Sequence, residues 1–421
     1  MLKMLKRVGI ALLGLVLLVC AGVSAYWFWG DGPRGDRAFV ARTYDEAIAL
    51  YDKELARGYW WDSYRLHMLL RRGFSHGELN QDAEAATDYD AALVIRPDSP
   101  EVHTLRGQQH VNVLEWEAAL REYDTALTLD PTNNYLRARR AWIFDQTLDV
   151  DRAIEAYRAL RQVEPNQEYY YKREAYNLAR KGETAKAAEV IAAIPVYGSY
   201  DVNALVRRAI AYDYFSMSGL GMPDYERALR ISPRSALVLS SRGITYGAMN
   251  KHKLAMDDYN RAIEIEPTSR HIFYSRGREQ YMAGDYRAAL ADMRFAVSEV
   301  PFGPYSLIWI HLAETWLGEV DMKAFETNLT KLDDEDWPRP INEYLLGKID
   351  ETSLRKAAIE KASPADVIDH LCEVDYYLGA LALAKGNKRT ALPLIRKAAK
   401  TCPPGYVELW AARRNLRAMG E

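Results

Sequence analysis

The stretch Leu239–Pro267, LSSRGITYGAMNKHKLAMDDYNRAIEIEP, decides the fold because its pattern recurs along the chain. In successive windows of 34 residues, the position of Gly243 is always filled by a small residue: Gly73, Gly107, Ala141, Ala175, Ala209 and Gly277. The closing Pro267 recurs as well, with one exception at Ser199: the other prolines are Pro97, Pro131, Pro165, Pro233 and Pro301. Internal repetition at this period predicts similar supersecondary units stacked on one another.

Each window reads as two amphipathic helices. Twelve residues after the first small position comes a second one, at Ala85, Ala119, Ala153, Ala187, Gly221, Ala255 and Ala289. An aromatic residue follows four positions later, at Tyr89, Tyr123, Tyr157, Tyr225 and Tyr259. Small residues allow two antiparallel helices to approach closely, the tyrosine fills the space beside them, and the proline ends the second helix.

This pattern resembles the tetratricopeptide repeat (TPR) family. The resemblance implies an all-α fold: a right-handed superhelical solenoid of antiparallel helix pairs, with about ten units. Seven regular units are expected in residues 66–303. The remaining segments are expected to be N-terminal cap helices (38–65), a degenerate TPR-like helical region (304–371), and a final unit with a capping helix (372–421).

The N-terminal segment, residues 1–29, is predicted to be a targeting segment. Three basic residues near the start precede an apolar run long enough to span a bilayer. It is either a retained inner-membrane anchor that places the chain in the periplasm, or a signal peptide cleaved near Ala25. Residues 30–37 are expected to form a flexible linker, because they are rich in Gly and include a Pro.

Composition and motifs argue against several function classes. The 421 residues are 27% charged with a formal net charge of -3, and no basic stripe suited to nucleic acid is visible. No catalytic motif, cofactor-binding motif or metal-ligand spacing occurs. The chain is therefore expected to be no enzyme and to need neither cofactor nor metal.

Only two cysteines lie outside the leader. In the repeat frame, Cys372 begins the first helix of the last unit and Cys402 follows its second helix. Antiparallel helices bring these ends together, so a disulfide that closes a 29-residue loop is expected in an exported protein. The alternative is two unrelated buried thiols.

The C-terminal stretch, CEVDYYLGALALAKGNKRTALPLIRKAAKTCPPGYVEL, is similar to the final unit of NlpI-like exported bacterial TPR proteins. That similarity implies a periplasmic adaptor that docks cell-envelope enzymes such as proteases or peptidoglycan hydrolases.

The TPR resemblance also implies where a partner would bind. In that family the first helix of each unit lines a concave groove, and its second, fifth, sixth, ninth, twelfth and thirteenth residues, here called the groove positions, face the ligand. The groove residues predicted to bind a peptide or partner protein are Tyr135, Arg139, Trp142, Tyr169, Lys172, Arg173, Tyr176 and Arg207. Aromatic residues with arginines are typical of binding hot spots. Alternatively, these tyrosines and the tryptophan only fill space between helices.

The sequence therefore predicts a non-enzymatic interaction scaffold of the bacterial cell envelope, with membrane contact through its N-terminal segment. Two alternatives remain: an envelope enzyme with an unrecognised site in 304–371, and a structural protein that only self-associates. Partner identity and oligomeric state are left open.

Overall fold

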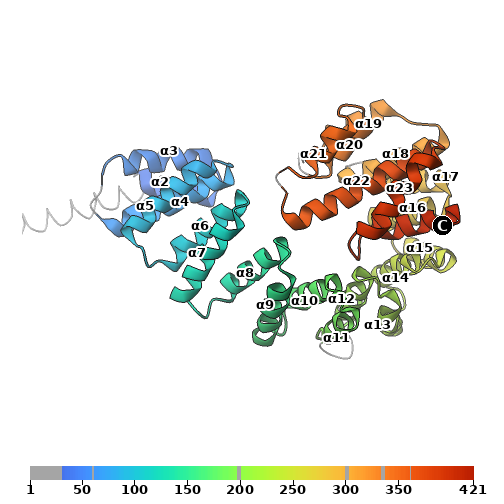
Figure 1. The fold of residues 1–421 in the computed structure, drawn as a ribbon, viewed down its shortest axis with the longest axis horizontal. Coiled ribbons are helices and arrows are strands. Elements are labelled where there is room, and N and C mark those ends of the chain that lie inside the picture. The colour runs from blue at the N-terminus through green and yellow to red at the C-terminus, as the bar shows by residue number, and fades with distance from the viewer. Residues whose placement is uncertain (1–30, 59–60, 197–200, 299–302, 333–336, 361) are drawn as a thin grey trace, which may run out of the picture. The chain divides into compact units, whose positions relative to one another are not determined.

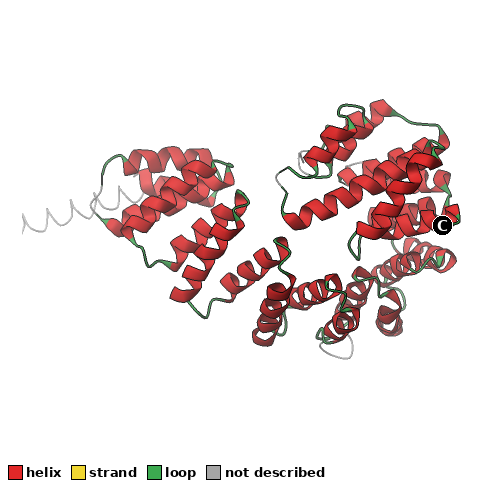
Figure 2. Cartoon of the chain, in the orientation of Figure 1, coloured by secondary structure: helices red, strands yellow, loops and turns green. Residues whose placement is uncertain are grey.

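The computed structural model describes residues 31–58, 61–196, 201–298, 303–332, 337–360 and 362–421. Over these ranges the chain consists of helices joined by turns (Figures 1 and 2). It divides into two compact units, residues 1–143 and 144–421. The predicted leader at 1–29 lies outside the described residues. None of the described helices has the length and apolar character needed to cross a membrane.

Unit 1 contains helices that pack as consecutive antiparallel pairs, α2 with α3, α4 with α5, and α6 with α7. Their bounds are α2 (Asp31–Val40), α3 (Tyr44–Leu55), α4 (Asp62–Glu78), α5 (Asp82–Ile95), α6 (Pro100–Asn112) and α7 (Trp116–Leu129). Helix α8 (Asn134–Gln146) runs across the division between the two units.

Unit 2 continues the pairing through α17 and again in α22 with α23. The bounds are α9 (Val150–Val163), α10 (Glu168–Arg180), α11 (Thr184–Ala192), α12 (Val202–Tyr214), α13 (Ser218–Ile231), α14 (Ala236–Ala248), α15 (His252–Ile265), α16 (Arg270–Ala283), α17 (Tyr286–Ala296), α18 (Pro304–Leu317), α19 (Met322–Leu329), α20 (Arg339–Leu345), α21 (Glu351–Ala357), α22 (Pro364–Ala384), α23 (Lys388–Thr401) and α24 (Val407–Met419). The predicted all-α fold of antiparallel helix pairs is confirmed.

The small residues lie where the two helices of a pair cross. A methyl group on Gly107 of α6 would come within 2.7 Å of a ring carbon of Tyr123 on α7. On α7, Ala119, Tyr123 and Ala126 are fully buried. The repeating motif thus sets the distance between paired helices, as the spacing predicted.

The turn between paired helices also repeats. Each contains one residue in the left-handed conformation, at Asn80, Leu114, Leu148, Gly182, Ser216, Asn250, Gly284, Gly318 and Gly386. Successive members are 34 residues apart up to Gly318, and Gly386 lies two periods later. The turn register therefore continues into the pairs α18–α19 and α22–α23, beyond the last regular proline.

The described part of the expected linker, residues 31–37, is helical and belongs to α2. Its glycines serve close packing: a Cβ on Gly35 would lie 2.8 Å from the ring of Tyr51. Gly35, Ala47 and Tyr51 have the same 12- and 16-residue spacing as Gly73, Ala85 and Tyr89. Helices α2 and α3 thus form a repeat pair offset by four residues from the later register.

The last helix pair begins earlier than predicted. Helix α22 starts at Pro364, eight residues before Cys372, because Ser363 and Asp366 form a capping box around its first turn. Pro364 at the first helical position suits this start. Cys372 lies within α22, and its Cα is 5.0 Å from that of Cys402 in a disulfide.

Candidate functional site

In unit 1, the predicted groove residues of α8 form an arginine–aromatic cluster. The guanidinium of Arg139 lies 5.0 Å from the ring centre of Trp142 and donates a hydrogen bond to Gln108 of α6. Trp142 meets Trp116 edge to face at 5.9 Å. Tyr135 is 59% exposed. In this cluster Trp142 therefore packs against neighbouring side chains, whereas Tyr135 is exposed to solvent.

A second cluster in unit 1 comes from α2, α3 and α4 and was missed by the sequence prediction. Asp36 accepts hydrogen bonds from Tyr51 at 2.8 Å and pairs with Arg71 at 3.4 Å. Arg71 lies over Phe39, which meets Phe74 at 5.5 Å. The prediction treated the first helices as a cap, although the Gly35–Ala47–Tyr51 spacing contained the signal for a full unit.

Burial by itself would raise the pKa of the Asp36 carboxyl. Hydrogen bonds from His67 and Tyr51, together with the charge of Arg71, bring that pKa below its ordinary value. Asp36 is therefore an anion that neighbouring donors already satisfy, and this part of the surface is less suited to an acidic ligand than the Arg139 cluster is.

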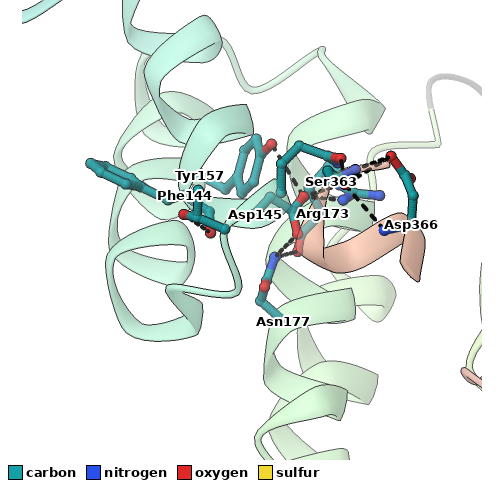
Figure 3. Close-up of polar contacts among 9 residues, drawn as sticks. Phe144, Asp145, Tyr157, Arg173, Asn177, Ser363 and Asp366 are labelled. Atoms are coloured by element: carbon teal, nitrogen blue, oxygen red, sulfur yellow. Dashed lines mark hydrogen bonds and ion pairs between the residues drawn. The ribbon is translucent and has the colours of Figure 1, made fainter. Parts of the chain in front are cut away.

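In unit 2, Arg173 of α10 binds a buried carboxylate of its own chain. Its Nε lies 2.5 Å from Asp145 Oδ2, and Asn177 donates to the other oxygen at 3.1 Å (Figure 3). Tyr157 reaches the same carboxylate at 3.5 Å. Asp145 is fully buried, so removing its cation would leave an uncompensated charge in the core. Arg173 joins the end of α8 to α10.

Three other predicted residues of α10 and α12 lie at the surface: Tyr169, Lys172 and Arg207. Glu168 forms one ion pair with Lys172 at 2.5 Å and another with Arg207 at 2.8 Å. Tyr169 is 46% exposed and meets Tyr157 edge to face at 6.0 Å. The exposed tyrosine and the two cations together form an accessible patch, which we call the α10–α12 patch.

Tyr176 has a different setting. It is buried, with the guanidinium groups of Arg173 and Arg180 at 4.9 and 5.2 Å from its ring centre. Its ring is 6.1 Å from that of Tyr214 on α12. The structure therefore brings Arg173 and Tyr176 into contact, and Tyr176 is buried whereas Tyr169 is exposed.

The groove positions near Tyr176 are covered by the C-terminal segment, residues 363–421. The Ser363 hydroxyl lies 2.7 Å from Gln146 Oε1, where the first turn of α22 meets the end of α8 (Figure 3). One turn further, Asp369 accepts a 2.6 Å hydrogen bond from Tyr406. Burial raises the pKa of Asp369 to about 6, while the hydrogen bond and the charges of Arg180 and Arg173 oppose that rise.

Helix α24 continues this cover along α12, α14 and α16. The loop before it presses on α12, since a Cβ on Gly405 would lie 2.4 Å from the carbonyl oxygen of Tyr214. Arg414 binds Glu279 of α16 at 3.0 Å. Trp410 lines a narrow gap with Ile244 and other groove residues of α14 and α16. In unit 2 the chain itself therefore occupies much of the surface that a ligand would use.

Two buried carboxyls of this segment, Glu373 and Glu408, accept hydrogen bonds from neighbouring helices and loops. Glu373 accepts hydrogen bonds from Tyr305 at 2.9 Å and Trp337 at 2.8 Å, and Glu408 accepts one from Tyr377 at 2.5 Å. Burial first, and then their mutual repulsion, raises the pKa of Glu373. At 5% and 3% exposure they connect helices rather than face solvent. Across the described ranges, no three His, Cys, Asp or Glu side chains gather to hold a metal ion.

One family model and several solved structures are similar to this chain. Residues 238–269 match the family model described as tetratricopeptide repeat. A TPR protein from Parabacteroides merdae ATCC 43184 is 14% identical, covering 67% of this chain and 98% of that one with a TM-score of 0.42. MamA is 21% identical, covering 38% and 85% with a TM-score of 0.35. YrrB, a TPR protein with an unusual peptide-binding site, is 16% identical, covering 46% and 97% with a TM-score of 0.33.

The family match falls on the stretch that defines the register, and the helix pairs continue that register on both sides of it. Proteins of this kind are generally protein-interaction scaffolds. The chain is a tetratricopeptide repeat protein.

Proposed function

We propose that this protein is a non-enzymatic scaffold of a bacterial cell envelope, which binds a peptide or a partner protein on the open parts of its concave surface. The observation that carries the proposal is the Arg139 cluster. It combines an exposed tyrosine, an arginine and a packed tryptophan at groove positions. Large aromatic surfaces beside directional cationic donors are what dominate binding energy in protein interfaces.

The α10–α12 patch is a second candidate binding surface, which belongs to unit 2. Tyr169 supplies exposed aromatic area. Lys172 and Arg207 form ion pairs with Glu168 in the free protein, and they pair with a carboxylate of the ligand instead when a partner binds. Arg173 and Tyr176 are left out of this patch, because Arg173 binds the buried Asp145 and Tyr176 is buried against Arg173 and Arg180.

The envelope setting is supported by the Cys372–Cys402 disulfide, because disulfides persist in oxidising compartments. The N-terminal segment 1–29, outside the described residues, is proposed to direct export, either as an anchor or as a cleaved signal. A cell-envelope protease or peptidoglycan hydrolase is the proposed class of partner.

A photo-crosslinking amino acid at Tyr135 or Tyr169, in the full chain in its native cells, tests the proposal. We expect a defined protein adduct from both positions and no such adduct from Arg121, an exposed residue on α7. Arg139→Glu should reduce the adduct at Tyr135 at least tenfold, because it reverses the charge of the central donor. Arg121→Glu is the matched control and should leave the adduct unchanged. Equal crosslinking in the Arg139→Glu variant, at unchanged helicity, would refute the proposal.

A further inference from the structure

Helix α24 has two sides with different chemistry. Arg414 points inward, where it is 11% exposed and pairs with Glu279, which also accepts a 2.9 Å contact from His252. Arg413 and Arg417, one helical turn apart, are exposed. Within the described residues, neither of them has a carboxylate within ion-pair distance. The outer side of α24 therefore carries cations that the fold does not use.

Two adjoining clefts lie beside these cations. The first, about 440 Å³, is bounded by Trp410, Arg413 and Arg417 on α24 and by the α12–α13 turn with the end of α14. The second, about 710 Å³, is bounded by Arg414 and Arg417 on α24, by Tyr286 and Trp316, and by Lys388. Both volumes fall in the range of small-ligand and peptide-side-chain sites, roughly 300–1,000 Å³. Because Arg417 borders both, they form one composite site, which we call the α24 cleft.

The lining of the α24 cleft joins positive charge to apolar surface. Tyr286 and Trp316 stack almost parallel, with ring centres 4.6 Å apart and an interplanar angle of 7°. Leu220, 55% exposed, belongs to the lining of the first cleft. Among the described residues that line the two clefts there are four basic side chains of Arg or Lys and no Asp or Glu. Such a lining complements a ligand with carboxylates and apolar side chains.

We propose that the α24 cleft binds an acidic segment of another protein, with carboxylates at Arg413, Arg417 and Lys388 and an apolar side chain against the Tyr286–Trp316 pair. Arginine forks bind carboxylates with two parallel hydrogen bonds, and a stacked aromatic pair provides a rigid apolar contact. This site goes beyond the two binding surfaces proposed above, which are the Arg139 cluster of unit 1 and the α10–α12 patch of unit 2. The repeat fold alone does not create it, because α24 supplies its cations.

The geometry favours a protein segment over a membrane. The cations border concave clefts rather than a protruding amphipathic face, which is the form that inserts into a lipid surface. Nucleic acid is disfavoured by the net charge of the chain, -3, and by the small number of free cations at this site.

The test uses the oxidised full chain and a fluorescein-labelled octapeptide in which Glu alternates with Phe or Leu. Fluorescence anisotropy should show saturable binding of this probe that weakens with added salt. Binding of the same peptide with Gln at every Glu should be at least tenfold weaker. Arg413→Glu with Arg417→Glu should weaken binding of the acidic probe at least tenfold, because the variant repels the carboxylates.

A double variant of the same charge change, Arg121→Glu with Arg230→Glu on exposed helix surfaces, should bind the acidic probe as the wild type does. Arg139→Glu should also bind it normally, so failure of the proposed groove function is distinguishable from failure of this site. No binding of the acidic probe, or equal binding of the Gln peptide, would overturn the proposal. So would binding of phosphatidylglycerol vesicles through Arg413 and Arg417 without binding of the peptide.

Discussion

At the scale of single residues, the helix crossings depend on whether a methyl group fits. Gly107 has a tyrosine ring in the place where its Cβ would be, whereas Ala141 holds a methyl group at the same position of another unit and is fully buried. The residue sixteen positions later is a fully buried tyrosine in both units, Tyr123 and Tyr157. The identity of the facing aromatic residue therefore does not decide between Gly and Ala at this position.

Gly107→Ala should destabilise the α6–α7 pair by about 1–3 kcal/mol, the usual cost of overpacking a filled core. Gly77→Ala is the matched control, since no atom lies within 4 Å of the added Cβ. It should be neutral or stabilise α4 by up to about 1 kcal/mol, because alanine favours helix. Thermal unfolding and amide hydrogen exchange of both variants measure the difference. Equal behaviour of the two variants would contradict the packing argument.

Asp213 should make the stability of unit 2 depend on pH. Burial raises the pKa of its carboxyl to about 6, although hydrogen bonds from Thr245, Ser218 and Tyr225 oppose the rise. A carboxyl whose pKa is raised in the folded state favours folding while it is protonated. Its contribution is therefore complete below its ordinary pKa near 3.8 and is lost as the pH rises through about 6.

Asp213→Asn does not titrate, so it should gain stability relative to the wild type between about pH 4 and pH 7. The gain is up to about 3 kcal/mol, at ~1.4 kcal/mol per pKa unit. Denaturant unfolding of both proteins across this range measures it. Other titrating groups, including Asp369, are common to both proteins and cancel. A difference in stability that does not change with pH would show that the pKa of Asp213 is the same in the folded and the unfolded chain.

The sequence could predict which residues occupy groove positions, but not which of them meet each other. Arg173 and Asp145 both lie at such positions, and both could have faced a ligand. In the structure they bind one another across two helices. The repeat register predicts where each residue lies along its helix. Whether that residue contacts a ligand or another side chain of the protein depends on side-chain packing, which the sequence pattern does not specify.

At the scale of elements, the start of α22 is a feature that the repeat register did not predict. Imposing the 34-residue frame placed the start of this helix at Cys372, yet the Ser363–Pro364–Ala365–Asp366 sequence is a capping box with proline at the first helical position. The added turns bring Asp366 and Asp369 to the end of α8 and to α10. Local capping signals thus locate helix ends better than the repeat period does in degenerate units.

The disulfide holds the end of α23, where the chain enters the loop that leads to α24. It joins α22 to the residue after α23, directly before the loop that leads into α24. Replacing both cysteines by serine should cost about 2–4 kcal/mol, since the unfolded chain regains the freedom of a loop of ~30 residues. Limited proteolysis should then cut first between Pro403 and α24.

Two measurements check this prediction. Denaturant unfolding gives the stability loss, and mass spectrometry of the proteolytic fragments locates the first cut. The exported wild-type chain should also show no reactive thiol at either cysteine without a reductant. Two titratable thiols at these positions, or identical proteolysis of the wild type and the double serine variant, would contradict the role assigned to the disulfide.

At the scale of the whole molecule, both units consist of the same kind of helix pair, but they differ in how much of their groove positions stays exposed. Unit 1 leaves an arginine–aromatic cluster open at Tyr135, while unit 2 covers the groove positions of α12, α14 and α16 with its own C-terminal segment. The periodic sequence made the fold predictable. The cover was not predictable, because it joins degenerate elements to repeats more than 100 residues earlier, without a periodic signal.

The covered groove and the α24 cleft both depend on α24 lying in the groove of its own unit. Nitroxide labels at Ser216 and Arg413, which border the same 440 Å³ cleft, test it by pulsed electron paramagnetic resonance. The full chain is used with Cys20 replaced by serine and the disulfide intact. We predict a single narrow population of short distances. A broad population extending to long distances would show that α24 is not docked, and would contradict both the covered groove and the α24 cleft.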